Sequence, residues 1–258
     1  MRNSIRIIAT GFAALVFLMH LGLADAAEIK VLSAAGMRPV MEDLRPKFER
    51  ATGHKLTIAF AAASVIVKRI QDGETGDVVI TPWSIETLAK DGKVMAGSMT
   101  VIARVGLGVA VRKGAPKPDI SSPEAFKSML LAAKSITYLN PAQDGESGFL
   151  FARVLDRLGI ATEMKSKTVI PKTTGAVGGV VVNGDAEIAV LAVQHIQFIS
   201  GVGIELVGPL PKDLQETMVF SGAIMIGARN TEASKALLDY LRTPEATTVM
   251  KAKGMDPA

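Results

Sequence analysis

Four loops of small residues are the places in this sequence where residue type and spacing could support chemistry. Each is expected to follow a β-strand: Ser33-Ala34-Ala35-Gly36, Ala61-Ala62-Ala63-Ser64, Asp144-Gly145-Glu146-Ser147-Gly148 and Thr173-Thr174-Gly175. In open α/β sheets, ligands bind at the carboxyl ends of strands, and a helix N-terminus carries about half a positive charge. Small residues also let a ligand approach backbone N–H groups, which favours a small anion. The alternative is that these residues only form tight strand-to-helix turns.

Three polar side chains outside these loops could also contribute to such a site. Arg38 lies just past the first loop, where its guanidinium could bind a carboxylate through two hydrogen bonds. The alternative is an exposed arginine on the first turn of a helix. Gln194 and His195 follow a predicted strand and could add donors, although a purely structural His195 remains an open interpretation. If Arg38 faces the site, an organic acid is a better ligand than a metal oxyanion.

Motifs of enzymes, metal sites and nucleotide sites are poorly represented. The Gly145-Glu146-Ser147-Gly148 segment differs from a nucleophile elbow because its second glycine comes one residue early. No two histidines share a helical face, and no acidic cluster has metal-ligand spacing. Dinucleotide and P-loop fingerprints are absent, and basic residues are interleaved with acidic ones. We therefore expect no catalytic residue, metal, cofactor or nucleic-acid partner.

Alternating strands and helices are predicted to position these loops. Period-2 and buried runs predict strands at 29–33, 56–61, 77–81, 105–112, 135–139, 188–193 and 219–226. Helical spacing predicts helices at 37–48, 64–71, 84–90, 122–133, 147–158, 231–241 and 244–253. Pro39 suits a first helical turn, whereas Pro46 should kink or split its helix. The alternation predicts an α/β fold with mostly parallel sheets covered by helices.

The first 26 residues have the pattern of a signal peptide. Arg2 and Arg6 precede an apolar run at 7–23, which is followed by Ala24-Asp25-Ala26. A membrane anchor is the alternative, but the run is interrupted by polar and glycine residues and ends in small ones, so we predict export and cleavage after Ala26. The chain has 258 residues, 48% of them apolar and 21% charged, which is enough for one large folded domain or two smaller lobes. It has no cysteine, which excludes disulfides.

Several of these segments together resemble the molybdate-binding proteins of ABC importers, which are type II periplasmic binding proteins. The similar segments are 31–37, 60–64, 68–70, 77–80, 140–141, 147–148 and the closing helices up to 255. The resemblance implies two α/β lobes, residues 27–103 with 219–258 and residues 104–218, joined by paired hinge strands with a ligand cleft between them. It implies a monomeric periplasmic protein that delivers a small anion to an inner-membrane ABC permease. The alternatives are a secreted sensing module coupled to a receptor and an exported α/β enzyme.

This chain departs from the family pattern at the residues that would hold the ligand. In the family, serine hydroxyls, backbone N–H groups and a tyrosine hold a tetrahedral oxyanion. The serine positions fall on Gly36 and Ala63, and the tyrosine position falls near Ala192. These losses leave extra volume, so we predict a small organic acid in preference to molybdate. The expected ligand-binding residues are Ala35, Gly36, Arg38, Ala63, Ser64, Ser147, Thr174 and Gln194.

Overall fold

The structure, a computed structural model, describes residues 26–83, 85–141, 146–171 and 176–258. The predicted signal peptide, except its last residue Ala26, lies outside these ranges, and so does the predicted ligand-binding residue Thr174. Within the described ranges, no helix combines the length and the apolar character that crossing a bilayer would require.

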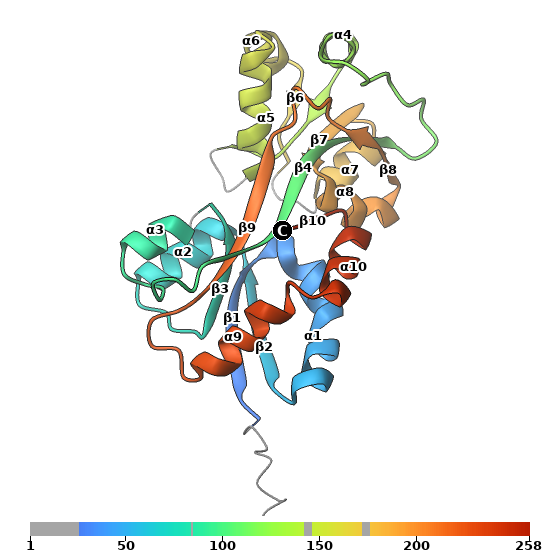
Figure 1. The fold of residues 1–258 in the computed structure, drawn as a ribbon. Coiled ribbons are helices and arrows are strands. Elements are labelled where there is room, and N and C mark those ends of the chain that lie inside the picture. Colours follow the sequence, from blue (N-terminus) through green and yellow to red (C-terminus); the bar gives the residue numbers. More distant parts are fainter. Residues whose placement is uncertain (1–25, 84, 142–145, 172–175) are drawn as a thin grey trace, which may run out of the picture.

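Strands and helices alternate along the described chain, as the sequence pattern predicts (Figure 1). The strands are β1 (Glu28–Ala34), β2 (Lys55–Ala61), β3 (Val78–Pro82), β4 (Thr100–Arg112), β5 (Ile136–Thr137), β6 (Thr168–Val169), β7 (Ile188–Ala192), β8 (Ile204–Pro209), β9 (Thr217–Ile224) and β10 (Asp256–Pro257). The α-helices are α1 (Arg38–Thr52), α2 (Ala63–Gln71), α3 (Ile85–Lys90), α4 (Pro123–Ala132), α5 (Glu146–Arg157), α6 (Ala161–Lys165), α7 (Ala176–Val182), α8 (Val193–Ile199), α9 (Thr231–Tyr240) and α10 (Pro244–Ala252). Two short 3-10 turns complete the set, η1 (Ala35–Met37) and η2 (Ser200–Val202).

The strands pair in the order β2-β1-β3-β9-β4-β7-β5-β6, with β8 and β10 also paired to β4. The pairs at both ends of this path are parallel: β1 with β2 and β3, and β5 with β6 and β7. Every pair that involves β4 or β9 is antiparallel. The predicted α/β class is confirmed. The expected mostly parallel pairing is wrong for the central strands, because β4 and β9 run past each other in opposite directions.

The long strands β4 and β9 connect two lobes (Figure 1). The first half of β4 pairs with β9, and from Leu107 onward β4 pairs with β7 and β8. The first lobe holds β1–β3 with α1–α3, α9 and α10, and the second holds β5–β8 with α4–α8 (Figure 1). The lobe boundaries that we predicted, at 103/104 and 218/219, fall within these two strands and stay a prediction.

Helix α1 shows how the local sequence produces an element that packs on the sheet. Its buried residues Val40, Met41, Leu44 and Phe48 follow helical spacing and join the core of the first lobe. Pro39 lies in the first turn, as predicted. The helix is not split at Pro46, which lies inside it on the exposed side. On that side, the carbonyl left without its usual N–H donor can bond water.

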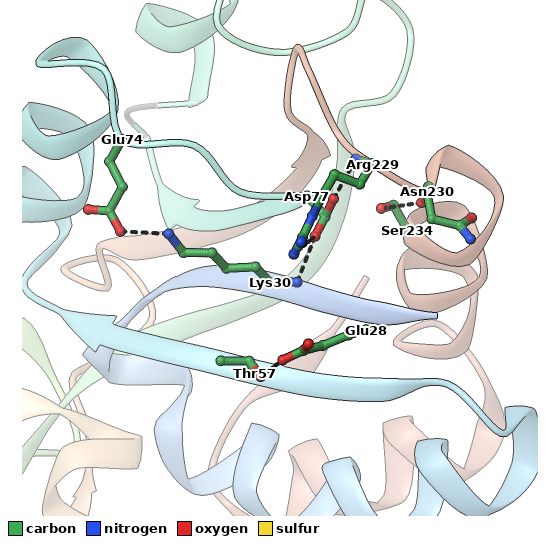
Figure 2. A network of polar contacts seen from close by, with 8 residues as sticks. All are labelled: Glu28, Lys30, Thr57, Glu74, Asp77, Arg229, Asn230 and Ser234. Carbon is green, nitrogen blue, oxygen red and sulfur yellow. Dashed lines mark hydrogen bonds and ion pairs between the residues drawn. The ribbon is translucent and has the colours of Figure 1, made fainter. Parts of the chain in front are cut away.

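A buried carboxylate connects β1, the start of β3 and the loop before α9 (Figure 2). Asp77 is 2% exposed, and its carboxylate accepts hydrogen bonds from the backbone N–H groups of Lys30 at 2.8 Å and Arg229 at 2.7 Å. The Arg229 guanidinium lies 3.9 Å from the same carboxylate. Nearer the surface, the Lys30 ammonium pairs with Glu74 at 3.1 Å. The Asp77 side chain therefore accepts hydrogen bonds from two backbone N–H groups and joins the loop before α9 to β1.

Candidate functional site

A cavity of about 320 Å³ lies between the two lobes. The first lobe contributes the chain around η1 and the starts of α1 and α2, and the second lobe contributes the start of α5 and one side of α8. The lining residues are Ala34, Ala35, Gly36, Arg38, Pro39, Ala62, Ala63, Leu139, Glu146, Ser147, His195, Phe198, Ile199 and Met218. The volume falls at the lower end of the range of about 300–1,000 Å³ that is usual for pockets for small organic ligands.

Helix starts with no side-chain cap lie along this cavity. Ala34 precedes η1 and Ala62 precedes α2, and neither alanine side chain can accept a hydrogen bond from the first backbone N–H groups. The first N–H groups of a helix have no partner within the helix. Together with the helix dipole, they form a wall that favours an anion.

Five of the eight residues predicted to bind a ligand line the cavity: Ala35, Gly36, Arg38, Ala63 and Ser147. Thr174 lies outside the described residues. Ser64 is exposed and is not among the lining residues. It follows Ala63 on α2, and successive residues of a helix point about 100° apart, so these two residues do not face the same side.

Gln194 and His195 lie in the first turn of α8, a helix that the sequence analysis missed. Gln194 is buried beside Gly36: its Nε2 atom lies 3.4 Å from the position that a β-carbon on Gly36 would occupy. His195 lines the cavity directly. The apolar run of β7 continues into Val193 and hid the helix start, but the spacing of the buried residues Ile196 and Ile199 was a signal for it.

Arg38 lines the cavity, and its guanidinium contacts two first-lobe residues that do not. Its Nη1 atom is 3.4 Å from the Glu42 carboxylate, one turn along α1, and its Cζ atom is 4.3 Å from the centre of the Phe60 ring. The side chain is 42% exposed. Arg38 is therefore both cavity-lining and partly exposed, and its charge is paired with Glu42 and stacked on Phe60.

Several buried polar atoms near the cavity have no hydrogen-bond partner among the described residues. They are the Ser147 hydroxyl, both amide atoms of Gln194 and the Nδ1 atom of His195. Leaving a buried polar group without a partner costs about 1–3 kcal/mol, and folded proteins rarely do so without a functional reason. Within the described ranges, no three metal-ligating side chains are grouped to hold a metal ion. We interpret the unpartnered atoms as sites for an organic or oxyanion ligand.

Gly148 fixes the position of Ser147 at the start of α5. A β-carbon on Gly148 would lie 1.8 Å from the carbonyl oxygen of Leu139, so only glycine permits this close approach. Leu139 also lines the cavity. The contact between Gly148 and Leu139 therefore sets how closely the start of α5 packs against the cavity wall.

Burial lowers the pKa of His195 to about 4, so the ring is neutral at physiological pH. The unfolded pKa is about 6.5, so between these values the unfolded chain binds more protons than the folded protein. The contribution of neutral His195 to the free energy of unfolding is therefore fully present above about pH 6.5. It is lost as the pH falls towards 4, by at most about 1.4 kcal/mol per pH unit.

We predict that acidification from pH 7 to pH 4.5 lowers the free energy of unfolding more in the wild-type protein than in His195→Gln, which does not titrate. Urea denaturation of both proteins at the two pH values measures the difference. Equal losses in the two proteins would contradict the prediction.

The two lobes, the connecting strands β4 and β9 and a cavity walled by uncapped helix starts define a binding protein that encloses its ligand between two lobes. Residues 29–256 match the bacterial extracellular solute-binding proteins, and the chain belongs to that family.

The chain is similar over most of its length to several proteins. It is similar to an aconitate isomerase from Pseudomonas sp, with 32% identity over 237 residues that cover 89% of this chain and 87% of that protein. It is also similar to the molybdate-binding protein ModA from Azotobacter vinelandii, with 30% identity over 237 residues and 90% of each chain covered. The solved structure of the Azotobacter vinelandii periplasmic molybdate-binding protein has a similar fold, with a TM-score of 0.71 at 20% identity over 88% of this chain and 98% of that one. The predicted resemblance and two-lobe fold are confirmed.

Proposed function

We propose that this protein is the periplasmic solute-binding component of an ABC importer and that it captures a small organic acid between its lobes. The observation that carries the proposal is the cavity of about 320 Å³, walled by the uncapped starts of η1 and α2 and by Ser147 of the second lobe. In this proposal, residues 1–26 are removed on export, and the mature monomer delivers its ligand to an inner-membrane permease. Residues 27–103 with 219–258 act as one lobe, and residues 104–218 act as the other.

Three features favour an organic acid over molybdate. Gly36 and Ala63 line the cavity and offer no hydroxyl to a compact oxyanion. Arg38 lines the cavity and could offer its planar cation to a carboxylate. One relative is named an aconitate isomerase, and aconitate is a tricarboxylate. The relative named for molybdate binding supports the broader statement that the ligand is a small anion.

Ligand binding would stabilise a closed arrangement of the lobes because the ligand contacts both. The first lobe would supply backbone N–H groups and Arg38, and the second would supply Ser147 and α8. Trp83 of the first lobe and Phe149 of the second already meet edge to face, with ring centroids 6.3 Å apart at 67°. This aromatic pair is a direct contact between the lobes, and it would help to stabilise the closed form that a permease recognises.

The proposal predicts that small carboxylates stabilise the mature protein, residues 27–258, against heat. A ligand at 100 times its dissociation constant raises the free energy of unfolding by about 2.7 kcal/mol. We would screen citrate, cis-aconitate, trans-aconitate, malate, succinate and molybdate by thermal shift and titrate the positives by calorimetry.

Replacing Arg38 with alanine should weaken carboxylate binding by about tenfold or more, because a charge-assisted contact is lost. Arg45→Ala, an exposed change on the same helix that does not line the cavity, is the matched control and should bind like wild type. Submicromolar molybdate binding, without a response to any carboxylate and without an effect of Arg38→Ala, would show that the proposed ligand class is wrong.

A second candidate function is isomerisation of an unsaturated carboxylic acid by proton transfer. Two observations favour it: the relative named an aconitate isomerase, and the neutral imidazole of His195 in the cavity, which could take and return a proton. A pKa of about 4 makes His195 a weak base at neutral pH, which favours binding without catalysis. Following cis-aconitate by NMR in the presence of the protein separates the two: no conversion supports pure binding, and conversion that disappears in His195→Gln supports the isomerase.

A further inference from the structure

Two uncharged polar side chains with unpartnered atoms, Ser147 and His195, line the second-lobe side of the cavity, and a third, Gln194, is next to His195 on α8. Ser147 and Gln194 are each 2% exposed, and Ser147 and His195 line the cavity. Gln194 is not itself a lining residue, but its Nε2 atom lies 3.4 Å from the β-carbon position of Gly36, which does line the cavity. The hydroxyl, both amide atoms and the Nδ1 atom of the imidazole lack partners among the described residues.

Each of these groups can accept a hydrogen bond as well as donate one. The serine hydroxyl does both, the glutamine amide has a carbonyl oxygen and an NH₂ group, and a neutral imidazole has one N–H and one bare nitrogen. Because burial keeps His195 neutral, the ring retains that bare nitrogen at physiological pH. A fully ionised oxyanion offers only acceptors, so it would leave the Gln194 carbonyl oxygen and the bare His195 nitrogen without a donor.

A hydroxyl group next to a carboxylate would satisfy this set. It can donate its hydrogen to the carbonyl oxygen of Gln194 or to the imidazole, and it can accept from the amide NH₂ or from Ser147. A site built to bond a hydroxyl rejects the analogue that lacks it, because the buried partners are then left unpaired.

We infer that Gln194, together with Ser147 and His195, selects acids that carry a hydroxyl group over the same acids without one. The inference rests on the proposed capture of an organic acid and narrows the substrate class to hydroxycarboxylic acids. Gln194 is the specificity-determining residue, since both of its polar atoms lack a partner.

If Gln194 serves ligand selection, its replacement should not lower the stability of the ligand-free protein, whereas the loss of a purely structural residue would. Leucine has nearly the volume of glutamine and has no polar atoms to satisfy. Replacing a buried, unpartnered polar group with an apolar one is neutral or stabilising. We therefore expect ligand-free Gln194→Leu to melt at or above the temperature of the wild-type protein while losing its preference for the hydroxyl.

Calorimetric titration of the mature protein with matched pairs of acids tests the inference. The pairs are malate with succinate, citrate with tricarballylate, and lactate with propionate; within each pair, the first acid carries a hydroxyl that the second lacks. For at least one pair, we expect the hydroxy acid to bind about tenfold tighter or more. The ratio should fall towards one in Gln194→Leu. It should be unchanged in Gln197→Leu, the same substitution at an exposed position of α8.

The outcomes separate this inference from the proposed function. If the acids bind but the two members of every pair bind equally, or if the preference survives in Gln194→Leu, the inference is overturned and the proposed capture of organic acids stands. A Gln194→Leu protein that is unfolded or melts well below wild type also counts against the inference. If none of the acids binds, both the inference and the proposed ligand class are wrong.

Discussion

Replacing Gly148 with alanine is expected to lower the free energy of unfolding by about 3 kcal/mol or more and to abolish ligand binding. The new β-carbon would lie 1.8 Å from the carbonyl oxygen of Leu139, whereas real contacts of this kind are not shorter than 3.0 Å. The obstacle is backbone, so no side-chain rotation can relieve it. The start of α5 would have to move away, and Ser147 and Glu146, which line the cavity, would move with it.

The matched control is Gly179→Ala, the same substitution in α7. Gly179 is exposed, has no atom within 4 Å of its β-carbon position and lies inside a helix, so alanine should be neutral or slightly stabilising there. Chemical denaturation and calorimetric titration measure both effects. A Gly148→Ala protein with wild-type stability and affinity would mean that the contact with Leu139 is not as close as the structure has it.

Replacing Asp77 with alanine is expected to destabilise the first lobe by about 3 kcal/mol. The change leaves the backbone N–H groups of Lys30 and Arg229 without their acceptor at a site where Asp77 is 2% exposed (Figure 2). Asp77 does not line the cavity, so the protein that remains folded should keep its ligand affinity. Urea denaturation, followed by titration at a temperature where the variant is folded, measures both properties.

Glu74→Ala is the control for Asp77→Ala because it removes an acidic group from the same network at the surface. The ion pair between Lys30 and Glu74 involves side chains that are 34% and 29% exposed, and pairs near the surface contribute at most about 1 kcal/mol. A loss in Glu74→Ala as large as that in Asp77→Ala would indicate that the charge, and not the buried hydrogen bonds, stabilises this junction.

Part of the cavity lining could be predicted because small residues after a strand are a local signal. Gly36, Ala63 and Ser147 belong to three separate predicted loops, and all three line one cavity. Ser64 could not be placed from the sequence, because it is adjacent to Ala63 and only packing decides which of two neighbours faces inward. Arg38 illustrates the same difficulty: the residue lines the cavity, but its guanidinium contacts Glu42 and Phe60, and only packing decides this.

The sequence by itself determined the alternation of strands and helices and the type of loop at the helix starts, because periodicity and turn chemistry depend on residues close together in the chain. Only the tertiary structure decided the antiparallel direction of β4 and β9 and the meeting of Gln194 with Gly36 across the two lobes. It also decided that Gly148 must contact the Leu139 carbonyl. These features depend on how distant segments pack, and a side chain that lacks a partner can be recognised only when all its neighbours are in place.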